Sequence, residues 1–373
     1  MLPEPRVARD HVGAGSRGTI GVIFGGANSE HEVSIRSARS VVAALATSGW
    51  RVRLLGIDRA GAWHAVPSVD AFVRVTTAAS ADHTLPRGPR DGQLDGLDVV
   101  FPVLHGRGGE DGTVQGALEL AGLPYVGCGV LASALAMDKR MAARMLEAEG
   151  IPVVDTRSVT SVAELDEMVD GMPLPLFIKP NRAGSSVGAA RVDSIDGLAP
   201  AVRTALLEDS TVLVQPLVVA SEVSIGVLER AGGVLGVTGA SLLRLGDDDT
   251  FFSYDGKYGA GPGSPSGGRG NAGRGNPVHD TRLEIPAILP SELLATLQGM
   301  ALVAFDALGC SGLARVDFFV TGAGEIFLNE VNTMPGFARH SHYPRLWEST
   351  GLSYRELVDE LVDRALSRSG RLC

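Results

Sequence analysis

The chain has 373 residues, 45% of them hydrophobic and 20% charged, a balance that is ordinary for a globular protein with two or three domains. Its formal net charge of −10 argues against nucleic acid or an anionic membrane as the main partner. Three widely spaced cysteines indicate neither a disulfide framework nor a zinc site, and no apolar run approaches the ~20 residues of a transmembrane helix. We therefore expect a soluble cytoplasmic protein that begins with a flexible polar tail over residues 1–18.

Short apolar strands alternate with helical patterns in the first third of the chain. Strands are predicted at 19–24, 52–57 and 97–103, and a helix begins within 29–34. This alternation predicts an α/β fold with a parallel sheet, whose ligand site lies at the carboxyl ends of the strands. We assign residues 19–136 to this Rossmann-like N-terminal domain.

Two polar side chains follow strands of that domain. Glu30 stands at the helix start, where a carboxylate either caps the helix dipole or receives the ammonium group of a ligand. His105 opens a glycine-rich loop after the third strand, where glycines allow close backbone approach. It is either a structural residue or a ligand contact.

A strongly helical segment begins near Met137, where we place the start of a second domain, 137–217. Lys139 opens a strongly helical segment; its ammonium gains nothing from the dipole there, so it either contacts phosphate or is solvated. Lys179 lies among apolar neighbours in a predicted strand, 176–180, and a buried lysine requires an anionic partner. The Gly/Ser loop that follows, with Ser185 and Ser186, offers amides and hydroxyls to phosphate oxygens without the Walker spacing. Together these features predict a lid that covers phosphates.

The third domain, 218–373, begins after a strand predicted at 211–216. Gln215 and Glu222 suit an adenine edge and ribose hydroxyls respectively, although either is also compatible with plain surface. A Gly/Pro/Ser/Arg-rich segment then predicts a mobile loop within 250–280. Lys257 and Tyr258 stand at its root, where a cation and a phenol can close over a substrate.

A predicted β-hairpin, 313–320 with 325–331, organises the C-terminal region. Its turn is either Gly322–Ala323 or Ala323–Gly324, so Asp317 pairs with residue 328 or 330. Alternation places Arg315 beside Asp317, and it places on one face of the second strand the residues Ile326, Leu328, Glu330 and Asn332.

Asp317, Glu330 and Asn332 converge in either pairing, with Arg315 beside them. Oxygen ligands of this kind, with room for water and phosphate, suit Mg²⁺. The alternative is a solvated salt-bridge cluster on an exposed face of the sheet. The turn that follows, 332–336, can present backbone N–H groups to a ligand.

Seven segments in this order resemble the D-alanine–D-alanine ligase family of the ATP-grasp superfamily: GGANSEHEVS, FPVLHGRGGEDG, AMDK, IKPNRAGSSVG, FFSYDGKY, GLARVDFF and LNEVNTMPGF. The resemblance extends from Thr19 to Leu366. It implies an ATP-grasp fold with an N-terminal pre-ATP-grasp domain, usually as a homodimer. It also implies ligation of two D-alanines, in which ATP converts the first carboxylate to an acyl phosphate that the second amine attacks.

The resemblance also assigns the nucleotide site. The residues it places against the ATP phosphates are Lys139, Lys179, Ser186 and, toward the γ-phosphate, Lys257. Glu222 would take the ribose and Gln215 the adenine.

Metal and oxyanion sites follow from the hairpin and its turn. The resemblance implies that Asp317, Glu330 and Asn332 hold two Mg²⁺ ions, which Mn²⁺ can replace. Arg315 and the Gly336 N–H would form the oxyanion site.

The two amino acids are assigned to the remaining residues. Glu30 would receive the first ammonium group and, through Ser185 and Tyr258, tie the lid closed. His105 would lie near the first carboxylate, and Ser341 would bind the second.

Departures from the family pattern concern the acceptor. Tyr258 favours an amine nucleophile, whereas the segment 338–342 differs from the usual sequence beside the second-substrate pocket. A ligase that uses D-serine, D-lactate or another acceptor is therefore the alternative, and a non-catalytic nucleotide-binding protein is the alternative of another class.

Overall fold

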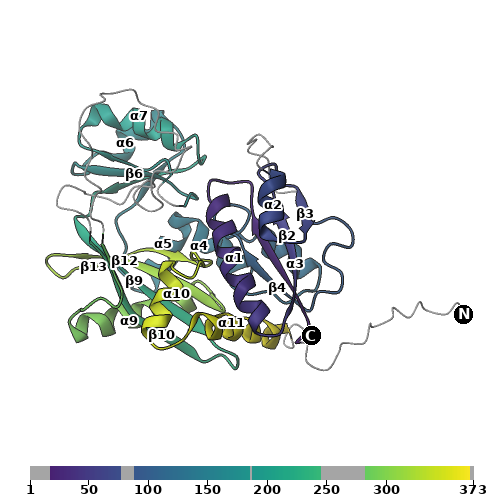
Figure 1. The fold of residues 1–373 in the computed structure, drawn as a ribbon. Helices are drawn as coiled ribbons and strands as arrows, with labels where there is room; N and C mark the ends of the chain where they lie inside the picture. The colour runs from purple at the N-terminus through teal and green to yellow at the C-terminus, as the bar shows by residue number, and fades with distance from the viewer. Residues whose placement is uncertain (1–16, 77–87, 185–186, 245–281, 370–373) are drawn as a thin grey trace, which may run out of the picture.

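The computed structural model describes residues 17–76, 88–184, 187–244 and 282–369 (Figure 1). The sequence-predicted loop at 250–280 lies outside these residues. So do four candidate site residues: Ser185, Ser186, Lys257 and Tyr258.

The first sheet confirms the predicted α/β pattern. Its strands, in sheet order, are β3 (Trp63–Val66), β2 (Arg51–Ile57), β1 (Thr19–Gly25) and β4 (Val99–Val103). β1 is fully buried and pairs in parallel with both β2 and β4, while β3 adds an antiparallel edge. The carboxyl ends of β1 and β4 therefore lie side by side, and the chain leaves them toward Glu30 and His105.

Helices cover both faces of this sheet. One face packs against α1 (His31–Thr47), α2 (Val69–Thr76) and α11 (Tyr354–Ser369), and the other packs against α3 (Thr113–Leu120). The C-terminal helix α11 thus belongs to the core of the N-terminal sheet (Figure 1).

The second sheet is antiparallel and forms the upper left lobe in Figure 1. Its strands, in order, are β5 (Arg157–Val159), β8 (Val212–Pro216), β6 (Leu176–Pro180) and β7 (Ala190–Val192). Its core is shared with α6 (Leu165–Met168), a short 3-10 turn (Val162–Glu164) and α7 (Ile195–Ala205). The strand predicted at 176–180 is found with those bounds.

The third sheet is the largest. Its strands, in order, are β11 (Arg282–Glu284), β10 (Leu235–Arg244), β9 (Ala220–Glu229), β12 (Leu313–Thr321) and β13 (Ile326–Asn332). One face packs against α4 (Val130–Met137), α5 (Lys139–Ala148) and α9 (Ser291–Ala307). α10 (His342–Ser349) contacts β9 and β10, where the Tyr343 hydroxyl donates a 2.7 Å hydrogen bond to the Val227 carbonyl. No helix within the described ranges is long and apolar enough to cross a membrane.

The hairpin β12–β13 resolves the two alternatives for its turn. The Gly324 amide donates to the Thr321 carbonyl at 2.9 Å, so Gly322 and Ala323 form the turn, and Gly324 adopts a φ of 85°. A regular hairpin with this turn would pair Asp317 with Leu328, yet Asp317 pairs with Glu330, the pairing expected from the other turn.

The prediction that Leu328 shares a face with Glu330 is wrong. The pairing shifts between Asp317–Glu330 and Phe318–Leu328, which leaves Asn329 as an extra residue in a β-bulge. Leu328 is consequently buried in the core, while Asn329 and Glu330 both line the cavity described below. Simple alternation fails here because a bulge shifts the side-chain period by one residue.

Candidate active site

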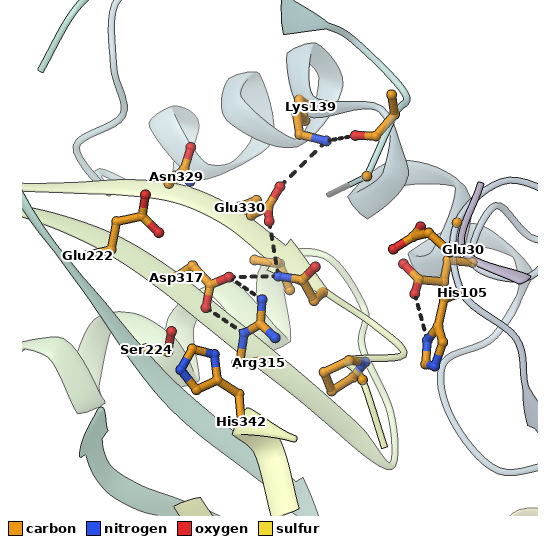
Figure 2. A pocket seen from close by; sticks show the side chains of 18 of the residues that line it. Glu30, His105, Lys139, Glu222, Ser224, Arg315, Asp317, Asn329, Glu330 and His342 are labelled. Atoms are coloured by element: carbon orange, nitrogen blue, oxygen red, sulfur yellow. Dashed lines mark hydrogen bonds and ion pairs between the residues drawn. The ribbon is translucent and has the colours of Figure 1, made fainter. Parts of the chain in front are cut away.

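A cavity of about 940 Å³ lies where the three sheets meet. The sequence-predicted residues that line it are Glu30, His105, Lys139, Lys179, Gln215, Glu222, Arg315, Asp317, Glu330, Asn332, Gly336 and Ser341. These are all the candidates that fall within the described residues. Figure 2 shows the acidic cluster on β12 and β13 at the centre, with Glu30 and His105 across the cavity.

The predicted convergence of Asp317, Glu330 and Asn332 is present. The Asn332 amide nitrogen lies 2.9 Å from Asp317 Oδ2 and 3.4 Å from Glu330 Oε1. Arg315 donates to both carboxylate oxygens of Asp317, at 2.8 and 2.6 Å, and Lys139 Nζ lies 3.5 Å from Glu330 Oε2 (Figure 2). Cationic and amide groups thus compensate the repulsion between the two carboxylates.

The cluster lies in the cavity wall. The side chains of Asp317 and Glu330 are 13% and 25% exposed, so a solvated cluster on an open sheet face does not describe them. Within the described ranges no group of three His, Cys, Asp or Glu side chains forms a metal cage. The two carboxylates suit a magnesium ion that takes other ligands from water and phosphate. Asn332, whose nitrogen faces both carboxylates here, becomes a ligand when its amide turns its oxygen toward them.

Asn329 is a cavity residue that the sequence analysis missed. The bulge turns it toward Lys179, whose Nζ donates to Asn329 Oδ1 at 3.3 Å. One polar partner of Lys179 is thus a side-chain amide that comes from another sheet. The sequence around Asn329 gives no sign of a bulge, because this residue lies in an otherwise regular strand pattern.

The loop after β6 is fixed to the start of α5. Asp138 caps α5 by accepting from the Met141 amide at 3.0 Å, and the Arg140 amide donates to Asn181 Oδ1 at 2.9 Å. Lys139 Nζ then donates to the Ala183 carbonyl at 2.8 Å (Figure 2). These bonds bring the following residue, Gly184, to the cavity.

Gly184, in the loop after β6, and Gly106, in the loop after β4, enclose the carboxylate of Glu30. A Cβ atom added to Gly184 would lie 2.6 Å from Glu30 Oε2, and one added to Gly106 would lie 2.5 Å from the same oxygen. A side chain at either point would therefore displace the Glu30 carboxylate from this position. Glu30 thus lies against the loop after β6 at Gly184, while its predicted bonds to Ser185 and Tyr258 lie outside the described residues.

His105 is buried, with 3% of its surface exposed, and both ring nitrogens bond to protein atoms. Nδ1 lies 2.9 Å from the Met334 carbonyl and 3.6 Å from Glu110 Oε1, while Nε2 lies 3.0 Å from Ser37 Oγ. Ser37 and Glu110 join the site here, although no motif or spacing in the sequence marks them as site residues.

Burial and charge set the pKa values of this pair. Burial raises the pKa of Glu110 to about 7, opposed by its bond to His105 and supported by the charge of Glu30. Burial works to lower the pKa of His105, but the adjacent Glu110 carboxylate outweighs it, so the pKa of His105 is raised. The pair can hold one proton between them near neutral pH.

Gln215 and Glu222 line the same cavity from β8 and β9. The amide nitrogen of Gln215 donates to Thr156 Oγ1 at 2.6 Å, which directs its hydrogen-bond donor into the protein. The carbonyl oxygen is then the group that can accept from a ligand.

The turn after β13 leads into α10 and carries the last candidates. Ser341 is the N-cap residue of α10, and its hydroxyl lies 3.3 Å from the point where a Gly336 Cβ would stand. His342 also lines the cavity, and Figure 2 places its ring near Arg315 and Ser224. The helix start and the Gly336 amide give this side of the cavity an electropositive character.

Two family models match the chain. The model described as D-ala D-ala ligase N-terminus matches residues 19–128, and the model described as D-ala D-ala ligase C-terminus matches residues 145–363. A "D-alanine--D-alanine ligase" of Rhodococcus erythropolis is 41% identical, covering 95% of this chain and 98% of the relative. "D-alanine--D-alanine ligase A" of Chromobacterium violaceum is 39% identical, covering 95% and 96%.

Solved structures of similar proteins agree with these matches. The VanG D-Ala:D-Ser ligase from Enterococcus faecalis superposes with a TM-score of 0.77 at 33% identity, covering 93% of this chain and 99% of the other. The D-alanine-D-alanine ligase from Coxiella burnetii superposes with a TM-score of 0.75 at 30% identity, covering 96% of each chain.

Proposed function

We propose a role for each cavity residue from one premise: the chain belongs to the D-alanine–D-alanine ligase family. It is an ADP-forming ligase that joins two D-alanines through an acyl phosphate and so supplies a precursor of peptidoglycan. The observation that carries the residue assignments is the convergence of Asp317, Glu330 and Asn332 with Arg315 and Lys139 in one cavity.

ATP lies between the second and third sheets in this proposal. Lys139 and Lys179 approach this space from different elements, and both are cations suited to phosphate oxygens. Glu222 accepts from the ribose hydroxyls, and the Gln215 carbonyl accepts from the adenine amino group because its nitrogen bonds to Thr156. We assign Ser186 and Lys257 to the phosphates from the family resemblance alone.

Asp317, Glu330 and Asn332 would hold Mg²⁺, and we propose two ions. When bound, the metal supplies charge neutralisation to the phosphate oxygens during transfer. Arg315 has two roles in this arrangement. It orients Asp317 through two hydrogen bonds, and its guanidinium faces the carbonyl oxygen of the acyl group that reacts.

The first D-alanine binds at the N-terminal side of the cavity. Glu30 receives its ammonium group, and His105 borders the subsite of its carboxylate, which attacks the γ-phosphate. Gly184 lies against Glu30, so closure of the lid loop and binding of this substrate are linked. From the family resemblance, we propose that Ser185 and Tyr258 hydrogen-bond with Glu30 and so also tie the lid closed.

The second D-alanine binds beside α10. Ser341 at the start of α10 holds its carboxylate, and its amine attacks the acyl phosphate. Arg315 and the Gly336 N–H stabilise the oxyanion of the tetrahedral intermediate, which then expels phosphate. We further propose that the enzyme is a cytoplasmic homodimer, as is usual in the family.

The test is ATP-dependent phosphate release by the purified protein with Mg²⁺ and D-alanine, with product masses measured in parallel. Formation of D-alanyl-D-alanine supports the proposal. Absence of phosphate release with any D-amino acid would contradict it and favour a non-catalytic nucleotide-binding protein.

D-Serine is the second candidate acceptor, because His342 lines the cavity beside Arg315 and can bond to a hydroxyl group. Competition between D-alanine and D-serine for the acceptor position, read as the ratio of the two dipeptide masses, distinguishes the two. D-Lactate tested in the same assay reports whether a hydroxy acid is accepted.

A further inference from the structure

Helix α1 carries three serines at intervals of three residues, which places them along one face of the helix: Ser34, Ser37 and Ser40. Ser34 and Ser37 are fully buried. The Ser34 hydroxyl bonds within the N-terminal domain: it donates to the Val103 carbonyl and accepts from the Gly25 amide at 2.8 Å. The other two serines contact the third domain.

Ser37 and Ser40 bond to the backbone of the loop between β13 and α10. The Phe337 amide donates to Ser37 Oγ at 3.1 Å, and the Arg339 amide donates to Ser40 Oγ at 3.1 Å. His105, from the loop after β4, donates from Nδ1 to the Met334 carbonyl at 2.9 Å. The N-terminal domain therefore holds this loop at three backbone positions, Met334, Phe337 and Arg339.

Ser37 and His105 form one unit. A carbonyl oxygen can only accept, so Nδ1 of His105 carries the proton of the bond to Met334. The other ring nitrogen, Nε2, lies 3.0 Å from Ser37 Oγ, which itself accepts from Phe337. The ring is thereby fixed at both nitrogens, and the two anchored backbone groups stand on either side of Gly336.

We propose that Ser37 and His105 are positioning residues that fix the turn carrying the Gly336 N–H for oxyanion stabilisation. The inference rests on the proposed function, in which that N–H faces the tetrahedral intermediate. An oxyanion donor is effective only when it is held in place before the reaction, because reorganisation during the reaction costs free energy. The N-terminal domain provides that support through buried side chains that need not touch either substrate.

The experiment compares Ser37→Ala and His105→Leu with the wild-type enzyme. Four quantities are measured: kcat, the KM of each D-alanine, the Kd of ATP, and the Ki of a phosphinate dipeptide analogue of the tetrahedral intermediate. We expect kcat to fall by about 10- to 100-fold, with a parallel loss of affinity for the phosphinate. The Kd of ATP should change less than about threefold in both variants, and so should the KM of the first D-alanine in Ser37→Ala, because Ser37 does not line the cavity.

Two further variants make the result specific. His105→Asn places an amide nitrogen where Nδ1 stands, so it should restore much of the activity lost in His105→Leu. The kcat of the double variant Ser37→Ala/His105→Leu should be only slightly lower than that of the less active single variant, because both residues act on one turn.

Ser34→Ala is the matched control, since Ser34 is equally buried one helical turn earlier and bonds to β1 and β4. We expect it to lower the thermal unfolding midpoint while kcat and phosphinate affinity stay near the wild-type values. Equal losses of kcat in Ser34→Ala and Ser37→Ala would overturn the proposal, because they would indicate general destabilisation.

A raised KM for the first D-alanine in His105→Leu, with full kcat and an unaffected Ser37→Ala variant, would also overturn it. That result would make His105 a direct substrate contact. Failure of the proposed function is distinguishable from both outcomes, because the wild-type enzyme itself would then release no phosphate with D-alanine.

Discussion

Arg315 and Asp317 form a two-point ion pair on one face of β12, with nitrogen–oxygen distances of 2.8 and 2.6 Å. They stand two residues apart, so strand alternation alone directs both into the cavity. The ion pair fixes the orientation of the Asp317 carboxylate. Asp317 stands opposite Glu330, its partner residue across the hairpin. An arginine suits this role because its planar guanidinium matches both carboxylate oxygens.

Asp317→Asn is expected to reduce ATP-dependent phosphate release by at least about 100-fold, because it removes one of the two negative charges that would hold Mg²⁺. The amide keeps the volume of the side chain and one acceptor for Arg315, so the thermal unfolding midpoint should shift by only a few degrees. Calorimetric titration of Mg²⁺ with a non-hydrolysable ATP analogue should show weakened metal binding. Asp306→Asn, at an exposed position of α9, is the control, and retention of full activity in Asp317→Asn would refute the metal assignment.

Asn329→Ala removes the hydrogen bond that orients Lys179 from the neighbouring sheet. If Lys179 contacts ATP phosphates, we expect the KM of ATP to rise by about tenfold, equivalent to about 1.4 kcal/mol, while the KM of both D-alanines changes little. The stability cost should be small, because the bulge residue lies outside the regular ladder. Steady-state kinetics with varied ATP provide the measurement. An unchanged KM of ATP would show that Asn329 does not position Lys179 for the nucleotide.

The strands and helices of this fold were largely visible in the sequence, because their apolar patterns are local. β6 was predicted with its observed bounds, and β1, β2 and β4 were placed within about two residues. The convergence of Asp317 with Glu330 was also predictable, since a hairpin relates the two strands through a short turn.

Contacts between distant segments were not predictable in this way. Asn329 depends on a bulge that no local pattern marks, and Ser37 reads as an ordinary helix serine until α1 is placed against the loop after β13. Glu110 and Glu30 acquire their electrostatic relationship only through burial at a shared cavity wall. Each of these features arises from tertiary packing, which composition and periodicity do not encode residue by residue.

Gly184→Ala tests the contact between the lid loop and Glu30. The added Cβ would stand 2.6 Å from Glu30 Oε2, and the flexible carboxylate can move away at little cost in stability. If Glu30 receives the ammonium group of the first D-alanine, its displacement should raise the KM of that substrate by about tenfold. Gly322→Ala is the control, because a Cβ at that position meets no atom within 4 Å. Equal kinetic constants for Gly184→Ala and Gly322→Ala would argue against a role of this contact in substrate binding.

Glu110→Gln tests the buried proton beside His105. The pKa of Glu110 is raised from 4.5 to about 7 in the folded protein, chiefly by burial and further by the charge of Glu30. Between these pH values the folded state retains a proton that the unfolded state has lost, so the free energy of unfolding decreases as pH rises. This contribution is complete below about pH 4.5 and is lost as pH passes 7. The raised pKa of His105 acts in the same direction.

Glutamine is neutral throughout this range, so Glu110→Gln should remove that part of the pH dependence. Relative to the variant, the wild-type protein should lose on the order of 2 kcal/mol of unfolding free energy between pH 4.5 and 7.5. Urea unfolding at several pH values provides the measurement, and differences between the two proteins cancel the titration of distant groups. Glu147→Gln, at an exposed position of α5, should run parallel to the wild type. A wild-type curve parallel to that of Glu110→Gln would mean that Glu110 titrates as an ordinary carboxyl group.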